Sequence, residues 1–156
     1  MKISEIMSVK SVDVKANGSI SAKIGMKVET VPVNVFDSDK GFSYQLPAGS
    51  YKDANGDMKY YHPLYPQDAN AVKTAVEEAM SSGDGWKPGD GSNRYKGTAV
   101  LKEADLWVDV RLSKGGKVIM PARIGKDGKE GMVIPLKKDD PLRDTIKDKI
   151  LEVVAA

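Results

Sequence analysis

The chain contains an internal repeat, and this repeat constrains the fold more than any other feature. Residues 47–80 align with residues 121–154 at a shift of 74 positions, without a gap. Seven of the 34 aligned pairs are identical, where chance at average residue usage gives roughly two. The identical pairs include Pro47-Ala48 with Pro121-Ala122, and Met58 with Met132. A repeat of this length predicts one small domain written twice, so that the unit of function is a pair of domains.

The repeat extends upstream at a shift of 75, into two runs that have the alternating apolar pattern of β-strands. After each run comes a polar turn, at residues 37–41 and 113–116, and then a second apolar run, at residues 42–46 and 118–120. Two short strands around a Gly-bearing turn predict a β-hairpin in each copy. The aligned apolar positions of the first strand are Val31, Val33 and Val35 in one copy and Leu106, Val108 and Val110 in the other.

Each copy continues through a second polar turn, at residues 52–57 and 126–131, and closes with a predicted helix. Pro66 and Pro141 suit a first helical turn, where the missing N–H has no partner, and Asp139 or Asp140 can cap the second helix. Each unit is therefore predicted to be a small antiparallel β-sheet with a C-terminal α-helix, an α+β pattern. Apolar residues recur at helical spacing, as Val72, Ala75, Val76 and Ala79 in one helix and Leu142, Ile146, Ile150 and Val153 in the other.

Only the first copy has a long N-terminal extension. Residues 3–14 and 20–29 predict two more strands, joined at the turn-forming pair Asn17-Gly18, and residues 98–104 are the counterpart of the second strand. The segment between the copies has five glycines and few apolar residues, which is typical of a flexible linker. The predicted organisation is a first unit at residues 1–80, a Gly-rich linker at 81–97 and a diverged second unit at 98–156.

Four short motifs stand in order along the first half. They are Val35-Phe36-Asp37 through Gly41-Phe42, then Leu46-Pro47, then Asp53-Ala54-Asn55-Gly56, and Tyr61-His62-Pro63 before the closing helix. With these motifs, residues 1–80 resemble the SpoVG family (stage V sporulation protein G). The second half keeps Met120-Pro121 and the helix but has Leu136-Lys137 in place of His-Pro. It is similar to a diverged second copy of the same unit.

The resemblance implies a bacterial or phage-encoded regulator that binds DNA or RNA. SpoVG proteins are homodimers, so a tandem chain implies two units packed as an intrachain pseudo-dimer, with a whole-chain oligomer left open. One departure from the family concerns the residues after the hairpin proline, which are usually basic. Here they are Ala48-Gly49-Ser50-Tyr51-Lys52, with a single Lys. We interpret this either as a first copy that no longer binds nucleic acid or as a supporting role for that copy.

The uneven distribution of charge predicts where a nucleic acid binds. Residues 1–80 carry nine Lys and ten Asp or Glu, whereas residues 81–156 carry fifteen Lys or Arg and twelve Asp or Glu. The basic residues on turns and strand ends of the second copy predict a patch that neutralises phosphates. The alternative is an ordinary solvated surface, since acidic residues are interleaved. The candidate residues are Arg111, Lys114, Lys117, Arg123, Lys126, Lys129, Lys137 and Lys138.

Aromatic residues provide either stacking platforms for single-stranded bases or side chains that fill the contact between the copies. We expect Tyr44, Tyr60 and Trp107 to fill the contact between the copies or to cap the sheet, because no aromatic residue lies within the basic run itself. Trp86 lies in the Gly-rich segment. Because an exposed indole is unfavourable, Trp86 is expected to dock on the protein or on a partner.

No pattern in the chain predicts an enzyme, a cofactor or a metal site. His62 is the single histidine, and no nucleophile motif accompanies it. A His-Pro pair before a helix is more simply a turn in which the imidazole hydrogen-bonds the backbone. The loop that starts at Asp53 lacks the Glu that a calcium loop needs at its twelfth position, which is Leu64 here.

The remaining composition predicts a cytoplasmic protein. There is no cysteine, and therefore no disulfide or thiol chemistry. No apolar run suits a signal peptide or a membrane span, so no membrane partner is expected. Beside the nucleic-acid hypothesis stands one alternative, a protein-binding module from a phage or mobile element that uses the scaffold against a protein partner. The weak net charge of +2 favours this alternative.

Overall fold

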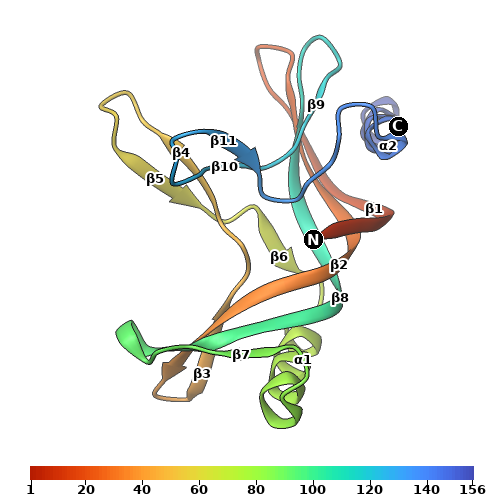
Figure 1. Cartoon of the computed structure of the whole chain (residues 1–156). Coiled ribbons are helices and arrows are strands. Elements are labelled where there is room, and N and C mark those ends of the chain that lie inside the picture. Colours follow the sequence, from red (N-terminus) through yellow and green to blue (C-terminus); the bar gives the residue numbers. More distant parts are fainter.

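Two long antiparallel strands form the centre of the protein. The computed structural model describes residues 1–156. In it β2 (Ile20–Ser38) pairs with β8 (Tyr95–Leu112), in a register that runs from Ile20 opposite Leu112 to Phe36 opposite Tyr95. Figure 1 shows the pair as a bent ribbon that passes through the whole molecule. Because β2 belongs to the first copy of the repeat and β8 to the second, the longest strand pairing joins the two copies.

Five shorter strands complete a seven-stranded antiparallel sheet around this ribbon. They are β1 (Lys2–Val14) and β3 (Gly41–Gln45), which pair with β2, and β6 (Leu64–Pro66), β7 (Trp86–Pro88) and β9 (Val118–Ile119), which pair with β8. Two hairpins have their own pairing, β4 (Gly49–Lys52) with β5 (Met58–Tyr61) and β10 (Ala122–Ile124) with β11 (Glu130–Met132). Two helices, α1 (Ala69–Ser82) and α2 (Pro141–Ala155), and a short 3₁₀ turn, η1 (Ser92–Arg94), complete the chain. The predicted α+β class with antiparallel strands is confirmed.

The ribbon changes its buried face at Thr30. Before this residue the buried side chains of β2 are at even-numbered positions, from 20 to 28, and after it they are at odd-numbered positions, from 31 to 35; Gly25, which has no side chain, is buried as well. Thr30 has a positive φ of 57°, a conformation that is unusual for a β-branched residue. β8 makes the same change between Leu101 and Ala104. The prediction of two separate strands in each of these segments is therefore wrong, because one continuous strand serves both halves of the ribbon.

The two helices lie against different parts of this ribbon (Figure 1). Helix α1 packs on β8, whereas α2 packs on β1 and β9. The second helix begins as predicted, with Pro141 in its first turn and Asp140 accepting a hydrogen bond from the N–H of Leu142. The first does not begin at Pro66, which lies in β6, because Asp68 caps the helix instead. Neither helix combines the length and the apolarity that crossing a membrane requires.

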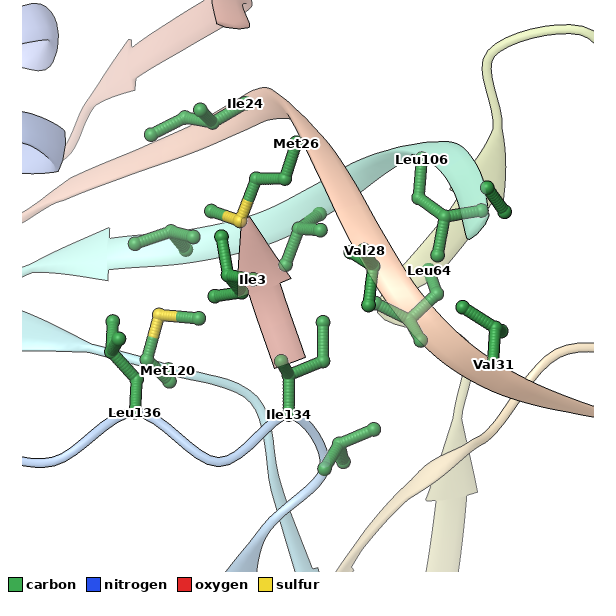
Figure 2. Close-up of a cluster of buried hydrophobic side chains, with 14 of the residues drawn as sticks. Ile3, Ile24, Met26, Val28, Val31, Leu64, Leu106, Met120, Ile134 and Leu136 are labelled. Carbon is green, nitrogen blue, oxygen red and sulfur yellow. The ribbon is translucent and has the colours of Figure 1, made fainter. Parts of the chain in front are cut away.

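All buried apolar side chains belong to one core. Figure 2 shows Met26 of β2 beside Ile3 of β1, with Ile134 below Ile3 and Leu136 next to Met120; Ile134 and Leu136 come from the segment between β11 and α2. β11 ends at Met132, so the apolar residues that follow it are not part of a strand. Both Ile134 and Leu136 are nevertheless buried, so the apolar run serves the core without strand pairing. The 28 buried apolar residues form a single cluster, which therefore draws on both copies of the repeat.

The Gly-rich segment 81–97 has regular structure, which corrects the expectation of a flexible linker. Helix α1 continues to Ser82, and β7 pairs along the ribbon, with Trp86 opposite Ala99 and Pro88 opposite Gly97. Trp86 is half-buried and packs against the core, which agrees with docking on the protein. The glycines made the segment resemble a linker, but the segment is held by strand pairing that a local sequence pattern does not reveal.

Candidate nucleic-acid interface

The eight predicted contact residues lie on five different elements, and all are exposed. Arg111 is on β8 and Arg123 is on β10. The six lysines occupy three loops, Lys114 and Lys117 between β8 and β9, Lys126 and Lys129 between β10 and β11, and Lys137 and Lys138 before α2. The six lysines lie on loops and Arg111 lies near the end of β8, as predicted, whereas Arg123 is the middle residue of β10. The question is which of the loops the fold brings together.

Arg143 brings two of these loops together. Its guanidinium donates hydrogen bonds to three main-chain carbonyl oxygens, Val118 at 2.7 Å, Leu136 at 2.6 Å and Lys137 at 2.8 Å. These bonds hold β9 and the segment before α2 against the first turn of the helix. Lys147 of α2 lies beside Gly116 in the β8–β9 turn. We call the resulting surface the basic end, and its residues are Lys114, Lys117, Lys137, Lys138 and Lys147.

The loop between β10 and β11 lies elsewhere, which corrects the prediction of a single patch. The N–H of Ile124 donates to the Ser50 hydroxyl at 2.7 Å, and this bond places β10 beside β4 of the other hairpin. In Figure 1 the β10–β11 hairpin approaches β4, while the β8–β9 turn lies at the far end of the ribbon, close to α2. Lys126 and Lys129 are therefore separated from the basic end, because their hairpin packs against the first copy instead of its own sheet.

Ion pairs involve six of the 13 basic residues before position 110 and none of those after it. All six ion pairs lie among residues 13–109, and the six cations involved are Lys15, Lys23, Lys27, Lys59, Lys96 and Lys102. Eleven Lys and Arg residues follow position 110, and none of them has a carboxylate within 4.0 Å. Because a cation already paired with a carboxylate has less to gain from a phosphate, all eleven of these residues are available to a polyanion, as are seven of the 13 basic residues before position 110.

Arg111 lines a cleft of about 670 Å³ between the sheet and the two hairpins. The sheet contributes Ser21 and Lys23 from β2 and Asp109 and Arg111 from β8, while the hairpins contribute side chains that include Ser50, Tyr51, Tyr61 and Glu130. The Tyr61 hydroxyl accepts a hydrogen bond from the N–H of Ala122 at 3.0 Å and donates one to its carbonyl oxygen at 3.1 Å. These two bonds tie the hairpins to each other and hold this wall of the cleft in place.

The carboxyl group of Asp109 in this cleft has a pKa above the ordinary value for an aspartate. Burial raises the pKa of its carboxyl group, and the Lys23 ammonium, at 3.7 Å, lowers the pKa in part. The other charged groups that line the cleft are Asp13 of β1, Arg111 of β8 and Glu130 of β11. Burial of a carboxylate favours its neutral form, so the ionised Asp109 is held at some cost to the fold.

We expect Asp109→Asn to remove a pH dependence from stability. The raised pKa means that folded Asp109 binds its proton more tightly than the unfolded chain does, so this residue favours the folded state most at low pH. That contribution is lost as the pH rises from the ordinary Asp pKa through the raised folded value. Between these limits the parent should lose stability relative to the variant, by less than about 1 kcal/mol because the pair is part-exposed. Urea unfolding across this pH range measures the free energy of unfolding of both proteins. If the two free energies changed with pH in parallel, Asp109 would not have a raised pKa in the folded state.

His62 does not behave as predicted. It is exposed, and its imidazole takes part in none of the side-chain hydrogen bonds of the structure, which include the bonds that the neighbouring Tyr61 makes. The turn is held instead by the backbone, where the N–H of Asp109 donates to the carbonyl oxygen of Pro63 at 2.8 Å. The chain therefore forms this turn without using the histidine side chain.

Sequence reasoning missed two features of this region. Arg143 was counted among the basic residues but not recognised as the group that joins the loops, because its three acceptors are backbone atoms that carry no sequence pattern. Lys10 and Lys23 were assigned no role, yet each ammonium lies over an aromatic ring of another strand, Trp107 and Tyr65 respectively. The alternation of polar residues in the strands was the available indication of this face.

Comparison with protein-family models, with curated proteins and with solved structures finds no match for this chain.

Proposed function

We propose that the chain is a non-enzymatic nucleic-acid-binding regulator of the SpoVG type, which contacts phosphates through the unpaired basic residues of its second copy. The observation that carries the proposal is the set of eleven Lys and Arg residues after position 110 without an ion pair. Cations that neutralise phosphates release condensed counterions, and this release drives binding largely independently of sequence. Five of these residues form the basic end, and Arg111 adds a guanidinium in the cleft.

We further propose that the two copies form an intrachain pseudo-dimer. In a two-fold assembly, equivalent residues meet at the axis. Two contacts follow this rule. Ser50 and Ile124, which are equivalent at the shift of 74, share a hydrogen bond. In the ribbon, Val28 and Glu29 are equivalent to Glu103 and Ala104 at the shift of 75. Val28 pairs with Ala104 and Glu29 pairs with Glu103. A two-fold axis between these two register pairs would exchange one for the other. The arrangement supports two units that share one sheet and one core.

Binding is expected to depend on charge more than on base recognition, and replacement of four basic residues tests this. The variant carries Arg111→Ala, Arg123→Ala, Lys137→Ala and Lys138→Ala. Its affinity should fall for all sequences alike, and the slope of log affinity against log salt should flatten by about one unit for each phosphate that is no longer neutralised. Fluorescence anisotropy with labelled oligonucleotides at several salt concentrations measures both quantities.

A matched control removes the same charge from residues that are already paired. It carries Lys15→Ala, Lys27→Ala, Lys59→Ala and Lys102→Ala, each within 4.0 Å of a carboxylate in the parent. The control should lose much less affinity and keep most of the salt slope. Equal losses in both variants would show that only net charge matters, and an unchanged first variant would place the site elsewhere.

One observation favours the alternative, a protein-binding module. The β4–β5 hairpin exposes Met58 and Tyr60, the latter 74% exposed, and the second hairpin exposes Met132. Exposed aromatic and Met side chains are enriched at protein interfaces. If the parent shows no binding to DNA or RNA even at salt concentrations near about 50 mM, where phosphate contacts are strong, the protein-partner function replaces the nucleic-acid one.

A further inference from the structure

A pair of aromatic rings lies on the face of the sheet opposite the core. Tyr65 of β6 and Trp107 of β8 are direct register partners. Directly opposed residues of an antiparallel pair point to the same face, and their neighbours Leu64 and Val108 are buried on the other one. The Trp107 indole lies across Gly25 of β2, because an added Cβ there would come within 3.0 Å of Cζ3 of the ring. The glycine thus leaves room for the indole on this face.

A lysine ammonium covers each ring. Lys10 Nζ lies 5.4 Å from the ring centroid of Trp107, and Lys23 Nζ lies 4.0 Å from that of Tyr65. A cation–π contact of a solvent-accessible lysine is weaker than the stacking of a nucleobase on an aromatic side chain. A base can therefore displace the ammonium from the ring, and Lys10, which unlike Lys23 has no ion pair, then remains close to the phosphate that follows the base.

These rings are continuous with the cleft. Lys23, which covers Tyr65, also lines the cleft together with Arg111. The opposite wall presents Tyr51 and Tyr61, whose ring centroids are 6.3 Å apart. Tyr51 is 51% exposed, so its ring is available to a ligand. The path from Trp107 to Tyr51 therefore holds aromatic rings and the cations Lys23 and Arg111, together with the carboxyl groups of Asp13, Asp109 and Glu130.

We propose that this face and the adjoining cleft bind single-stranded DNA or RNA, with unpaired bases stacked on Tyr65, Trp107 and Tyr51 and a phosphate on Arg111. The inference rests on the proposed nucleic-acid-binding function and names the form of nucleic acid that the protein binds. Aromatic platforms flanked by cations suit single strands, because every unpaired base offers a π-face. In a duplex the base faces are stacked on one another and cannot reach these rings.

The test compares an oligothymidylate single strand with a duplex of the same length. Tyr51→Ala and Tyr65→Ala should each weaken single-strand binding by about 5- to 150-fold and leave duplex binding and the salt slope unchanged, since no charge is removed. Tyr65→Phe should retain most of the affinity, which separates stacking from misfolding. Tyr60→Ala is the matched control for Tyr51→Ala. Tyr60 belongs to the same β4–β5 hairpin as Tyr51 but is exposed on its other face, so this variant should bind the single strand like the parent.

Tryptophan fluorescence gives an independent readout. Stacking on Trp107 should quench the emission when the single strand binds, and Trp107→Phe should remove this quenching, while Trp86 remains at β7 as an internal reference. Aromatic variants that bind the single strand like the parent, or a loss in Tyr60→Ala equal to that in Tyr65→Ala, would overturn the stacking site but leave phosphate binding intact. Absence of binding to both the single strand and the duplex would instead overturn the proposed function itself.

Discussion

Replacing Arg143 with alanine should lower the free energy of unfolding by about 2–4 kcal/mol, because a hydrogen bond to a charged group contributes about 1.5–3 kcal/mol and its removal leaves the acceptor unsatisfied. Arg143 donates to three backbone carbonyl oxygens, two of them in part-buried hydrogen bonds. The variant should release β9 and the segment before α2 from each other. Urea unfolding followed by circular dichroism measures the decrease.

Two variants make this result specific. Arg143→Lys should recover only part of the stability, since an ammonium lacks the planar fork that reaches several acceptors at once. Arg123→Ala removes the same side chain from an exposed position without hydrogen bonds or ion pairs, and should change the free energy of unfolding by less than about 0.5 kcal/mol. If Arg143→Ala were as mild as Arg123→Ala, the guanidinium would not be holding the basic end together.

Gly97→Ala should destabilise the protein by about 3–5 kcal/mol, from backbone strain and steric overlap together. Gly97 has a φ of +153°, and an added Cβ would overlap the carbonyl oxygen of Lys87 and approach the Trp86 ring to 2.7 Å. The methyl group would push β7 away from the ribbon. Thermal or urea unfolding measures the effect, and Trp86 fluorescence should shift to the red as the indole becomes exposed.

The same segment supplies the control. Gly91 also has a positive φ, of +79°, but an added Cβ there would meet nothing within 4 Å. Gly91→Ala should therefore cost only the backbone strain, about 1–2 kcal/mol. If Gly97→Ala were no worse than Gly91→Ala, β7 would be loosely attached and the expectation of a flexible linker would stand.

The two proposals assign different physical tasks to different parts of the molecule. The basic end and Arg111 supply charge that any nucleic acid can use, whereas Tyr51, Tyr65 and Trp107 supply ring faces that only unpaired bases can use. Affinity for a duplex should therefore follow the cations, and the preference for a single strand should follow the rings. The charge variants and the aromatic variants change these two quantities independently.

Local patterns in the sequence predicted many of the elements of the fold. Alternating apolar residues predicted several strands, Pro141 with Asp139 or Asp140 predicted the start of α2, and the repeat predicted that similar elements occur twice. These features depend on neighbouring residues, through strand and helix periodicity and through capping. They failed where a distant partner changed the outcome, as at Pro66, which joined the sheet as part of β6 instead of opening a helix.

The site depended far more on tertiary structure. The sequence identified the basic residues and their exposure on turns, but it could not show that the β10–β11 hairpin turns toward β4 and divides the expected patch. It could not show which cations are paired, because an ion pair such as Lys23 with Asp109 joins residues far apart in the chain. Composition and periodicity determined the α+β class and the inventory of charges. Only the antiparallel pairing of β2 with β8 decided which charges and rings share a surface, since it sets the neighbours of every residue on both faces of the sheet.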